Sequence, residues 1–319
     1  MCAASPERIS LATLGVPATS VPVDAAIGNG IVTVLFQPAR LVSFSESPLD
    51  RRVTMVVGDP ADTWRAIDRD PVDGTLWVAS EETVSLLRIG ADGRQVSVKG
   101  PAVSGRGGYS GIRLDTKSVY TLPTGADDAV WRLSREGRLL GRSFPRAPQE
   151  ENRRFESSGA RPHGEIALAR DPQGQVLALE SQTGRLFRAD SGGNWLPTGQ
   201  QFPMASPASG RTVQGESVGT AKEVWYVGGS LSDLFFIGSV PAALGPDASG
   251  THSRGALVFR LTSDATAASA LEPCAQGGIR KVVSDGTAFV VLAGGFGESS
   301  VTRRVIHPPE ILVGRFGAP

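Results

Sequence analysis

The stretch that decides the fold runs from Trp64 to Arg94 and reads WRAIDRDPVDGTLWVASEETVSLLRIGADGR. It contains two Asp-Gly pairs, and the runs beside them alternate between apolar and polar residues. Asp-Gly supplies the positive φ angles that tight hairpin turns require, and alternation is typical of half-buried strands. The stretch therefore predicts antiparallel strands joined by hairpins, and it has no helical period.

The same pattern recurs along the chain. A turn followed by a short β-type run, which we expect to be the second strand of each unit, appears again at Asp285-Gly286 and, in looser form, at Asn29-Gly30, Gln173-Gly174 and Lys222-Glu223-Val224-Trp225. A Gly-containing first strand is expected before it, as at Gly215–Val218. Further along most copies an Arg interrupts an otherwise apolar run, and these runs are Leu87-Arg88-Ile89, Trp131-Arg132-Leu133, Phe187-Arg188-Ala189, Phe259-Arg260-Leu261 and Gly314-Arg315-Phe316. Each copy predicts four antiparallel strands and almost no helix. Six units of ~40–50 residues indicate a β-propeller.

The repeat in Trp64–Arg94 resembles that of the NHL-repeat and gluconolactonase-like propellers, also called TolB-like, while the other five copies are degenerate. The resemblance and the repeats together imply an all-β fold, a six-bladed β-propeller of four-stranded antiparallel blades in a single domain over residues 1–319. The blades are expected at about residues 21–57, 58–100, 101–145, 160–200, 210–271 and 278–317. Because unrelated functions share this fold, the resemblance assigns no function by itself.

The ring is expected to close through the N-terminal segment. The last unit supplies three apolar strands and lacks its outermost one, whereas residues 9–14 alternate and belong to no complete unit. An open propeller would expose unpaired strand edges. We therefore expect residues 9–14 to pair into the last blade as its fourth strand.

Charge and hydropathy argue against two classes of partner. The 32 basic and 32 acidic side chains leave a formal net charge of +0, whereas sequence-independent nucleic-acid binding rests on accumulated positive charge. No apolar run approaches the ~18–20 residues needed to cross a bilayer. We expect neither nucleic-acid binding nor a transmembrane segment.

The cysteines bear on location rather than on chemistry. Cys2 and Cys274 are too few for a disulfide framework or a thiolate-rich zinc site. Cys2 directly follows Met1, which suits a mature bacterial lipoprotein whose signal peptide was replaced by a start Met; an ordinary reduced cysteine is the equal alternative. We expect the cell envelope or periplasm, and assembly into a larger complex, if Cys2 is a lipid-attachment site. Otherwise we expect the cytoplasm.

Three long insertions interrupt the repeats, at residues 145–162, 229–255 and 293–309. By strand order the first joins two blades and the others join second to third strands, which would place all three on one face. Long loops on one side of a rigid scaffold are commonly where binding occurs. The candidate binding residues of this loop-rich face are Arg154, Phe155, Tyr109, Arg161, Gln214, His252 and His307.

Two carboxylates, Glu165 and Glu216, are expected where inner strands begin, at the mouth of a central channel on the same face. With His163 beside them they would bind a divalent metal (Ca²⁺, Mg²⁺ or Zn²⁺) or act as acid and base, with the two Glu as ligands or base and His163 as proton shuttle. In the alternative the carboxylates line a water-filled channel and the histidines are exposed loop residues. No local spacing such as His-x-x-x-His supports a metal site.

The resemblance also weakens the metal interpretation. Gluconolactonase-like enzymes bind their metal through an acidic residue and Asn or Asp side chains, whereas this chain has only Asn29, Asn152 and Asn194. The leading hypothesis is therefore a non-catalytic binding or scaffold propeller that presents its loop-rich face to a protein or carbohydrate partner. The alternative is a metal-dependent hydrolase or lactonase with a site at the channel mouth, so the sequence leaves open whether the protein is an enzyme.

Overall fold

Short β-strands make up the part of the chain that can be described. The computed structural model describes residues 7–45, 52–103, 107–124, 129–145, 166–170, 174–180, 185–201, 223–230, 233–239, 256–262, 268–271, 279–284, 288–296 and 305–315. These ranges contain strands and turns and no helix, so they hold no helix that could span a membrane.

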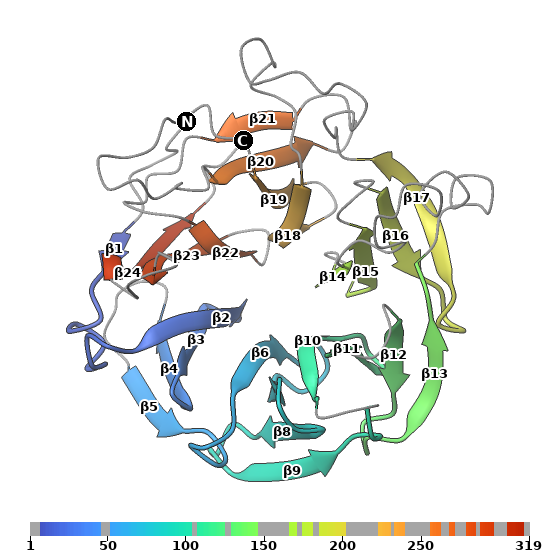
Figure 1. Ribbon diagram of the computed structural model, residues 1–319, viewed down its shortest axis with the longest axis horizontal. Helices are drawn as coiled ribbons and strands as arrows, with labels where there is room; N and C mark the ends of the chain where they lie inside the picture. Colours follow the sequence, from blue (N-terminus) through green and yellow to red (C-terminus); the bar gives the residue numbers. More distant parts are fainter. Residues whose placement is uncertain are drawn as a thin grey trace.

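The strands form four-stranded antiparallel sheets arranged around a common axis (Figure 1). The first sheet contains β2 (Val21–Gly28), β3 (Ile31–Gln37), β4 (Arg40–Ser45) and β5 (Arg52–Val56). The second contains β6 (Trp64–Arg69), β7 (Leu76–Ser80), β8 (Ser85–Ile89) and β9 (Gln95–Lys99). The third contains β10 (Tyr109–Leu114), β11 (Val119–Pro123), β12 (Val130–Leu133) and β13 (Leu139–Ser143).

The remaining sheets follow in chain order. The fourth contains β14 (Ile166–Arg170), β15 (Val176–Glu180), β16 (Arg185–Ala189) and β17 (Trp195–Gln201). The fifth contains β18 (Glu223–Ser230), β19 (Asp233–Ser239), β20 (Ala256–Thr262) and β21 (Ala268–Leu271). The last contains β22 (Ile279–Ser284), β23 (Ala288–Phe296), β24 (Val305–Arg315) and, from the other end of the chain, β1 (Glu7–Ile9).

This arrangement corrects the expected count of six equivalent blades. Five of the sheets are blades built from four consecutive strands, and no sixth blade of that kind exists among the described residues. The remaining sheet is composite, with the strand order β1-β24-β23-β22. The chain is therefore an all-β propeller with five continuous blades, and its circle is completed by a sheet to which both ends of the chain contribute.

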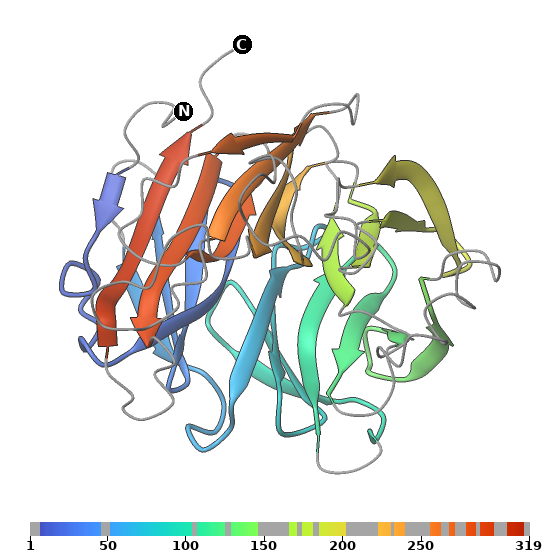
Figure 2. The ribbon, with the colours of Figure 1, turned by 45° about the horizontal axis from the view of Figure 1, so that its top comes forward.

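The first strand of each sheet lies nearest the axis. β2, β6, β10, β14, β18 and β22 each contact the first strands of the two neighbouring sheets, so these strands form a closed inner ring. Figure 2, an oblique view, shows the sheets standing side by side around it. The inner strands therefore carry the side chains that meet at the axis.

Asp-Gly turns form hairpins in the stretch Trp64–Arg94. In the turn between β6 and β7, Gly74 has a φ of +71°, which a residue with a side chain rarely adopts. The carboxylate of Asp73 accepts hydrogen bonds from the backbone N–H of Thr75 at 2.9 Å and from its hydroxyl at 2.6 Å. The following strand, β7, is buried along its whole length. Turn chemistry and apolar content therefore act together to make the second strand of the blade a core strand.

The N-terminal strand closes the composite sheet. β1 pairs antiparallel with β24, with Glu7 opposite Val313 and Ile9 opposite Ile311. The expected bounds 9–14 were wrong: the strand covers residues 7–9, so only Ile9 of the expected range pairs. The chain turns after it, where the N–H of Leu14 bonds the carbonyl of Leu11. The side chains of Leu11, Leu14 and Val16 are buried in a cluster that joins the first and last sheets. The closure therefore combines a short paired strand with buried apolar side chains that follow it.

The fifth blade begins later than the repeat predicts. Glu223-Val224-Trp225 was expected in a second strand, but it starts β18, the first strand of its sheet. The expected first strand at Gly215–Val218 lies outside the described residues. As a result β19 falls inside the predicted insertion 229–255, and the true connection between β19 and β20 is 240–255.

Candidate functional site

The inner strands have one edge that no strand of their own sheet covers. In an antiparallel ladder the N–H and C=O of alternate residues point away from the partner strand, so on an inner strand they point toward the axis. Such backbone groups need hydrogen-bond partners when buried. The side chains that meet this need come from neighbouring blades, and they form the polar centre of the molecule.

Ile67 in β6 shows how the backbone groups on this edge find hydrogen-bond partners. Its N–H donates to Oδ2 of Asp24 at 3.0 Å, and Asp24 belongs to β2 of the preceding blade. Its carbonyl accepts from Nη1 of Arg113 at 3.3 Å, and Arg113 belongs to β10 of the following blade. Asp24 and Arg113 are both buried, at 1% and 8% relative exposure. One acidic and one basic side chain thus clamp the middle strand between its two neighbours.

Leu114 in β10 repeats this arrangement one blade further on. Its N–H donates to Oδ2 of Asp68 at 2.8 Å, and its carbonyl accepts from Nη1 of Arg170 at 3.3 Å. Arg170 also lies 3.3 Å from Oδ2 of Asp68 and donates to the carbonyl of Arg69 at 2.7 Å. The carboxylate again comes from the preceding blade and the arginine from the following one. We call the two arrangements the Ile67 clamp and the Leu114 clamp.

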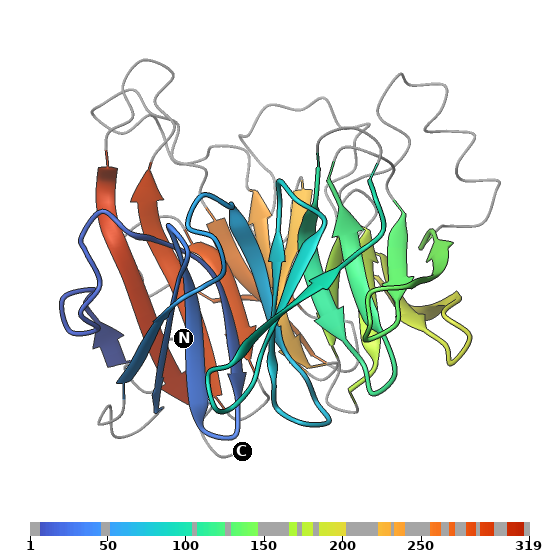
Figure 3. The same ribbon diagram turned by 90° about the horizontal axis from the view of Figure 1, so that it is seen from below.

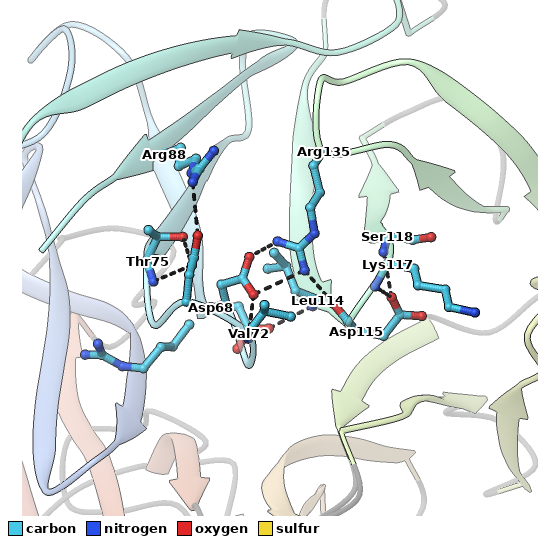
Figure 4. Close-up of polar contacts among 12 residues, drawn as sticks. Asp68, Val72, Thr75, Arg88, Leu114, Asp115, Lys117, Ser118 and Arg135 are labelled. Carbon is cyan, nitrogen blue, oxygen red and sulfur yellow. Dashed lines mark hydrogen bonds and ion pairs between the residues drawn. The ribbon is translucent and has the colours of Figure 1, made fainter.

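A buried ion pair fixes the turn that follows β6 to the turn that follows β12. Both terminal guanidinium nitrogens of Arg135 contact the carboxylate of Asp70, with Nη2 at 3.1 Å from Oδ1. Arg135 also donates to the carbonyl of Asp115 at 2.8 Å (Figure 4), while Asp70 accepts from the N–H of Val72. The Asp70 side chain is fully buried. This pair ties the second and third blades together.

A second group of charged residues comes from four neighbouring inner strands, and we call Asp24, Arg65, Arg113 and Lys281 the axial cluster. Nζ of Lys281, from β22, lies 3.2 Å from Oδ1 of Asp24. Burial lowers the pKa of Lys281 below its ordinary value of 10.5; Asp24 opposes this, and the positive charges of Arg113 and Arg65 add to it. Four inner strands therefore bring charged groups within electrostatic reach of one another.

Two of the predicted site residues lie in the described ranges. Tyr109 is fully buried, its hydroxyl donates to the carbonyl of Pro101 at 2.9 Å, and its ring packs edge-on against Trp131. Burial raises the pKa of the Tyr109 phenol. Tyr109 is therefore a packing residue between blades in this structure. His307 was expected in the insertion 293–309, but it lies in β24 opposite Gly295, because β23 reaches Phe296 and β24 begins at Val305. Only the backbone of His307 is described.

The other predicted site residues lie outside the described residues, so the structure brings none of them together. They are Cys2, Arg154, Phe155, Arg161, His163, Glu165, Gln214, Glu216 and His252. Across the described ranges, no group of three or more His, Cys, Asp or Glu side chains is placed to hold a metal ion. The expected metal site of Glu165 and Glu216 stays a prediction.

The sequence analysis missed Asp24 and Lys281. They are far apart in the chain, and no local motif indicates that the two side chains meet. A weak signal existed for Asp68, since Ile67-Asp68 and Leu114-Asp115 recur as an apolar-acidic pair at the end of inner strands. That pair indicated repetition, and it did not indicate a contact with the following blade.

Strand order places the longest connections on one side of the ring. Because each sheet is antiparallel, connections between sheets and those from second to third strands leave from the face where inner strands begin. The long connections 144–165, 202–222, 240–255 and 297–304 are all of these two kinds. The connections on the opposite face are short, as between β2 and β3 or β18 and β19. Figure 3 shows this geometry from the side, with strands running between the two faces.

The fold defines a β-propeller protein, and similar solved structures agree. No protein-family model matches the chain, and no curated protein matches it. A streptogramin B lyase superimposes with a TM-score of 0.60 at 11% identity over 97% of both chains. Virginiamycin B lyase from Staphylococcus aureus gives 0.53 at 10% identity, over 97% of this chain and 99% of the other.

A third structure widens the range of proteins that share the fold. A protein of unknown function from Bacteroides thetaiotaomicron gives a TM-score of 0.58 at 9% identity, over 97% of this chain and 72% of the other. Identities this low show the fold alone, because unrelated functions share propellers. The comparisons thus support a β-propeller, and they do not confirm the closer resemblance to the NHL-repeat and gluconolactonase-like families.

Proposed function

We propose that this chain is a non-catalytic binding or scaffold propeller that engages a protein or carbohydrate partner through the face where its inner strands begin. The observation that carries the proposal is the unequal length of the connections on the two faces. The longest, including 144–165 and 240–255, leave from that face, whereas the opposite face is closed by short turns. Loops on a rigid scaffold are common binding elements. Arg154 and Phe155, within 144–165, are the first candidate contacts.

The ion pairs support a scaffold rather than a catalytic centre in the described part. The clamp side chains hydrogen-bond backbone groups of neighbouring strands, so they hold blades together. The alternative, a metal-dependent hydrolase or lactonase, has no supporting contact in the described ranges. Metal analysis of the purified protein separates the two: a stoichiometric divalent ion that is lost on Glu165→Gln and Glu216→Gln would favour the enzyme.

A photo-crosslinking experiment tests the binding face. A photo-reactive phenylalanine analogue would replace Phe144, which is 37% exposed at the start of connection 144–165, or Val72, which is 63% exposed on the opposite face. We expect crosslinks to a partner in native cells from position 144 and none from position 72. Arg154→Ala with Phe155→Ala should reduce the yield from position 144. Crosslinking from position 72 alone would contradict the proposal.

A further inference from the structure

The outermost strand of the second blade, β9, lies on the rim of the ring (Figure 1). At one end of the β8–β9 hairpin the N–H of Gly90 donates to the carbonyl of Arg94 at 3.0 Å, and at the other the N–H of Gly100 donates to the carbonyl of Val84 at 2.9 Å. Hydrogen-bonded and non-hydrogen-bonded pairs alternate along an antiparallel ladder, and this ladder runs without a register shift. The odd-numbered residues of β9 therefore turn their N–H and C=O groups away from β8.

These outward-facing residues are Gln95, Ser97 and Lys99. Their backbone N–H and C=O groups make no hydrogen bond within the described ranges, and the bonds of Gln95 to the first blade come from its side chain. Gly137 of the third blade lies against the carbonyl of Lys99, so that end of the edge is partly covered. Ser97 at the centre is exposed, and the neighbouring Val96 is 47% exposed. The middle of β9 is therefore an accessible strand edge.

Two other outer strands carry features that hinder pairing with another chain. β13 has an irregular register that leaves Leu140 as an extra residue. β17 contains Pro197 and Gly199, and its register also shifts. Bulges and proline are the usual means by which proteins protect exposed strand edges. β9 has neither, so it keeps a regular edge of the kind that pairs with a further strand.

The sequence of β9 is self-complementary in the antiparallel direction. It reads Gln-Val-Ser-Val-Lys, with the two valines placed symmetrically about Ser97. When two copies pair antiparallel about this residue, the two Ser97 residues lie opposite each other and exchange both hydrogen bonds. Val96 then lies opposite Val98 of the other copy, and Gln95 lies opposite Lys99. Opposite β-branched residues are favourable, and no two like charges face each other.

We propose that β9 pairs with β9 of a second copy of this chain, antiparallel and centred on Ser97, to form a weak symmetric dimer. The formal net charge of +0 gives no overall repulsion between copies. A pair of five-residue strands is small beside the roughly 1,200 Å² that a stable interface buries, so association depends on concentration. β9 belongs to none of the long connections, so this inference does not rest on the proposed function. A dimer would present two binding faces to a multivalent partner.

Analytical ultracentrifugation of the full-length protein over a concentration series tests the proposal. We expect an average mass of 33.3 kDa at low concentration that rises toward the mass of a dimer. Ser97→Pro should weaken self-association about tenfold or more, because it removes an outward N–H and no bond to β8. Ser97→Lys, which sets like charges opposite each other, should do the same if Ser97→Pro fails to fold. Leu140→Lys, on the irregular edge of β13, is the matched control and should leave association unchanged.

Disulfide crosslinking tests the register in a background with Cys2 and Cys274 replaced by serine. Ser97→Cys should give a crosslinked dimer on oxidation, because the opposite Cα atoms lie about 5.5 Å apart, within the range of a disulfide. Lys99→Cys should not, because the two substituted residues would be separated by roughly 14 Å along the strands. Equal crosslinking of the two variants would overturn the antiparallel register. A wild type that keeps its monomer mass at every concentration would overturn the dimer and leave the edge to an extended segment of a different protein.

Discussion

At the scale of single residues, the turn 134–138 carries two arginines that differ in what they hold. Arg135 contacts both oxygens of the buried Asp70, while Arg138 lies 3.9 Å from Glu136 and both of those side chains are largely exposed. Breaking a buried pair leaves an uncompensated charge, whereas an exposed pair contributes little. Within the same turn, Arg135 therefore has a structural role, and Arg138 serves as its control.

Arg135→Met should lower the free energy of unfolding by about 3–5 kcal/mol, because the carboxylate of Asp70 would stay buried without its partner. Arg138→Met should leave it nearly unchanged. Urea denaturation followed by far-ultraviolet circular dichroism measures both. Equal effects of the two substitutions would contradict the structural role of the Arg135–Asp70 pair.

The lowered pKa of Lys281 predicts that the stability of the protein changes with pH in the alkaline range. Burial and the nearby Arg113 and Arg65 lower its pKa in the folded state, against the attraction of Asp24, while an unfolded lysine keeps a value near 10.5. Between the lowered value and 10.5 the unfolded chain binds more protons, so unfolding becomes less favourable as pH rises. The wild type should therefore gain stability relative to Lys281→Met across that window. Urea titrations at stepped pH measure the difference, and a constant difference would refute the linkage.

At the scale of elements, closure of the composite sheet depends on residues 8–14. The side chains of Ile9, Leu11 and Leu14 are buried, and Nε of Arg8 lies 2.6 Å from Oε1 of Glu310. Burying a Leu or Ile side chain contributes about 1.5–3 kcal/mol. Deletion of residues 1–15 should therefore cost several kcal/mol and lower the melting temperature of the whole ring.

Deletion of residues 1–5 is the matched control for closure by the N-terminal strand, since it leaves β1 and the following apolar residues intact. It should leave the melting temperature within experimental error. Scanning calorimetry of both truncations gives the comparison. A variant without residues 1–15 that melts like the full chain would show that the ring closes without its N-terminal strand.

The elements also show where sequence reasoning succeeds and where it stops. Asp-Gly turns and alternation predict the strands of the second blade well, because hairpin chemistry is local. The fifth blade was misassigned, since a short run such as Glu223-Val224-Trp225 suits a first or a second strand equally. The contacts at the axis could not be predicted: Asp68 and Arg170 lie 102 positions apart, and no local spacing encodes a contact set by the circular arrangement of blades.

At the scale of the whole molecule, the clamps couple blades that share no strands. Each clamp spans three consecutive blades through Ile67 or Leu114. A chain of this length commonly unfolds through intermediates. We nevertheless expect the second, third and fourth blades to unfold together, because opening any of them exposes charges that the others hold.

Single-tryptophan variants can report the blades separately, through Trp77, Trp131 and Trp195. Their urea midpoints should coincide in the otherwise unchanged protein and should separate when Asp24→Asn and Asp68→Asn weaken both clamps. Fluorescence of each variant measures this. Midpoints that already differ with the clamps intact would show that the blades unfold independently.

The composite sheet has a consequence for biosynthesis. During translation β1 is made before every other described strand, yet its partner β24 is made after all of them. The continuous blades can form while the polypeptide is still growing, but the segment with Leu11 and Leu14 stays unburied until β24 has been made. In that interval the growing chain is open to chaperones and to association with other nascent copies.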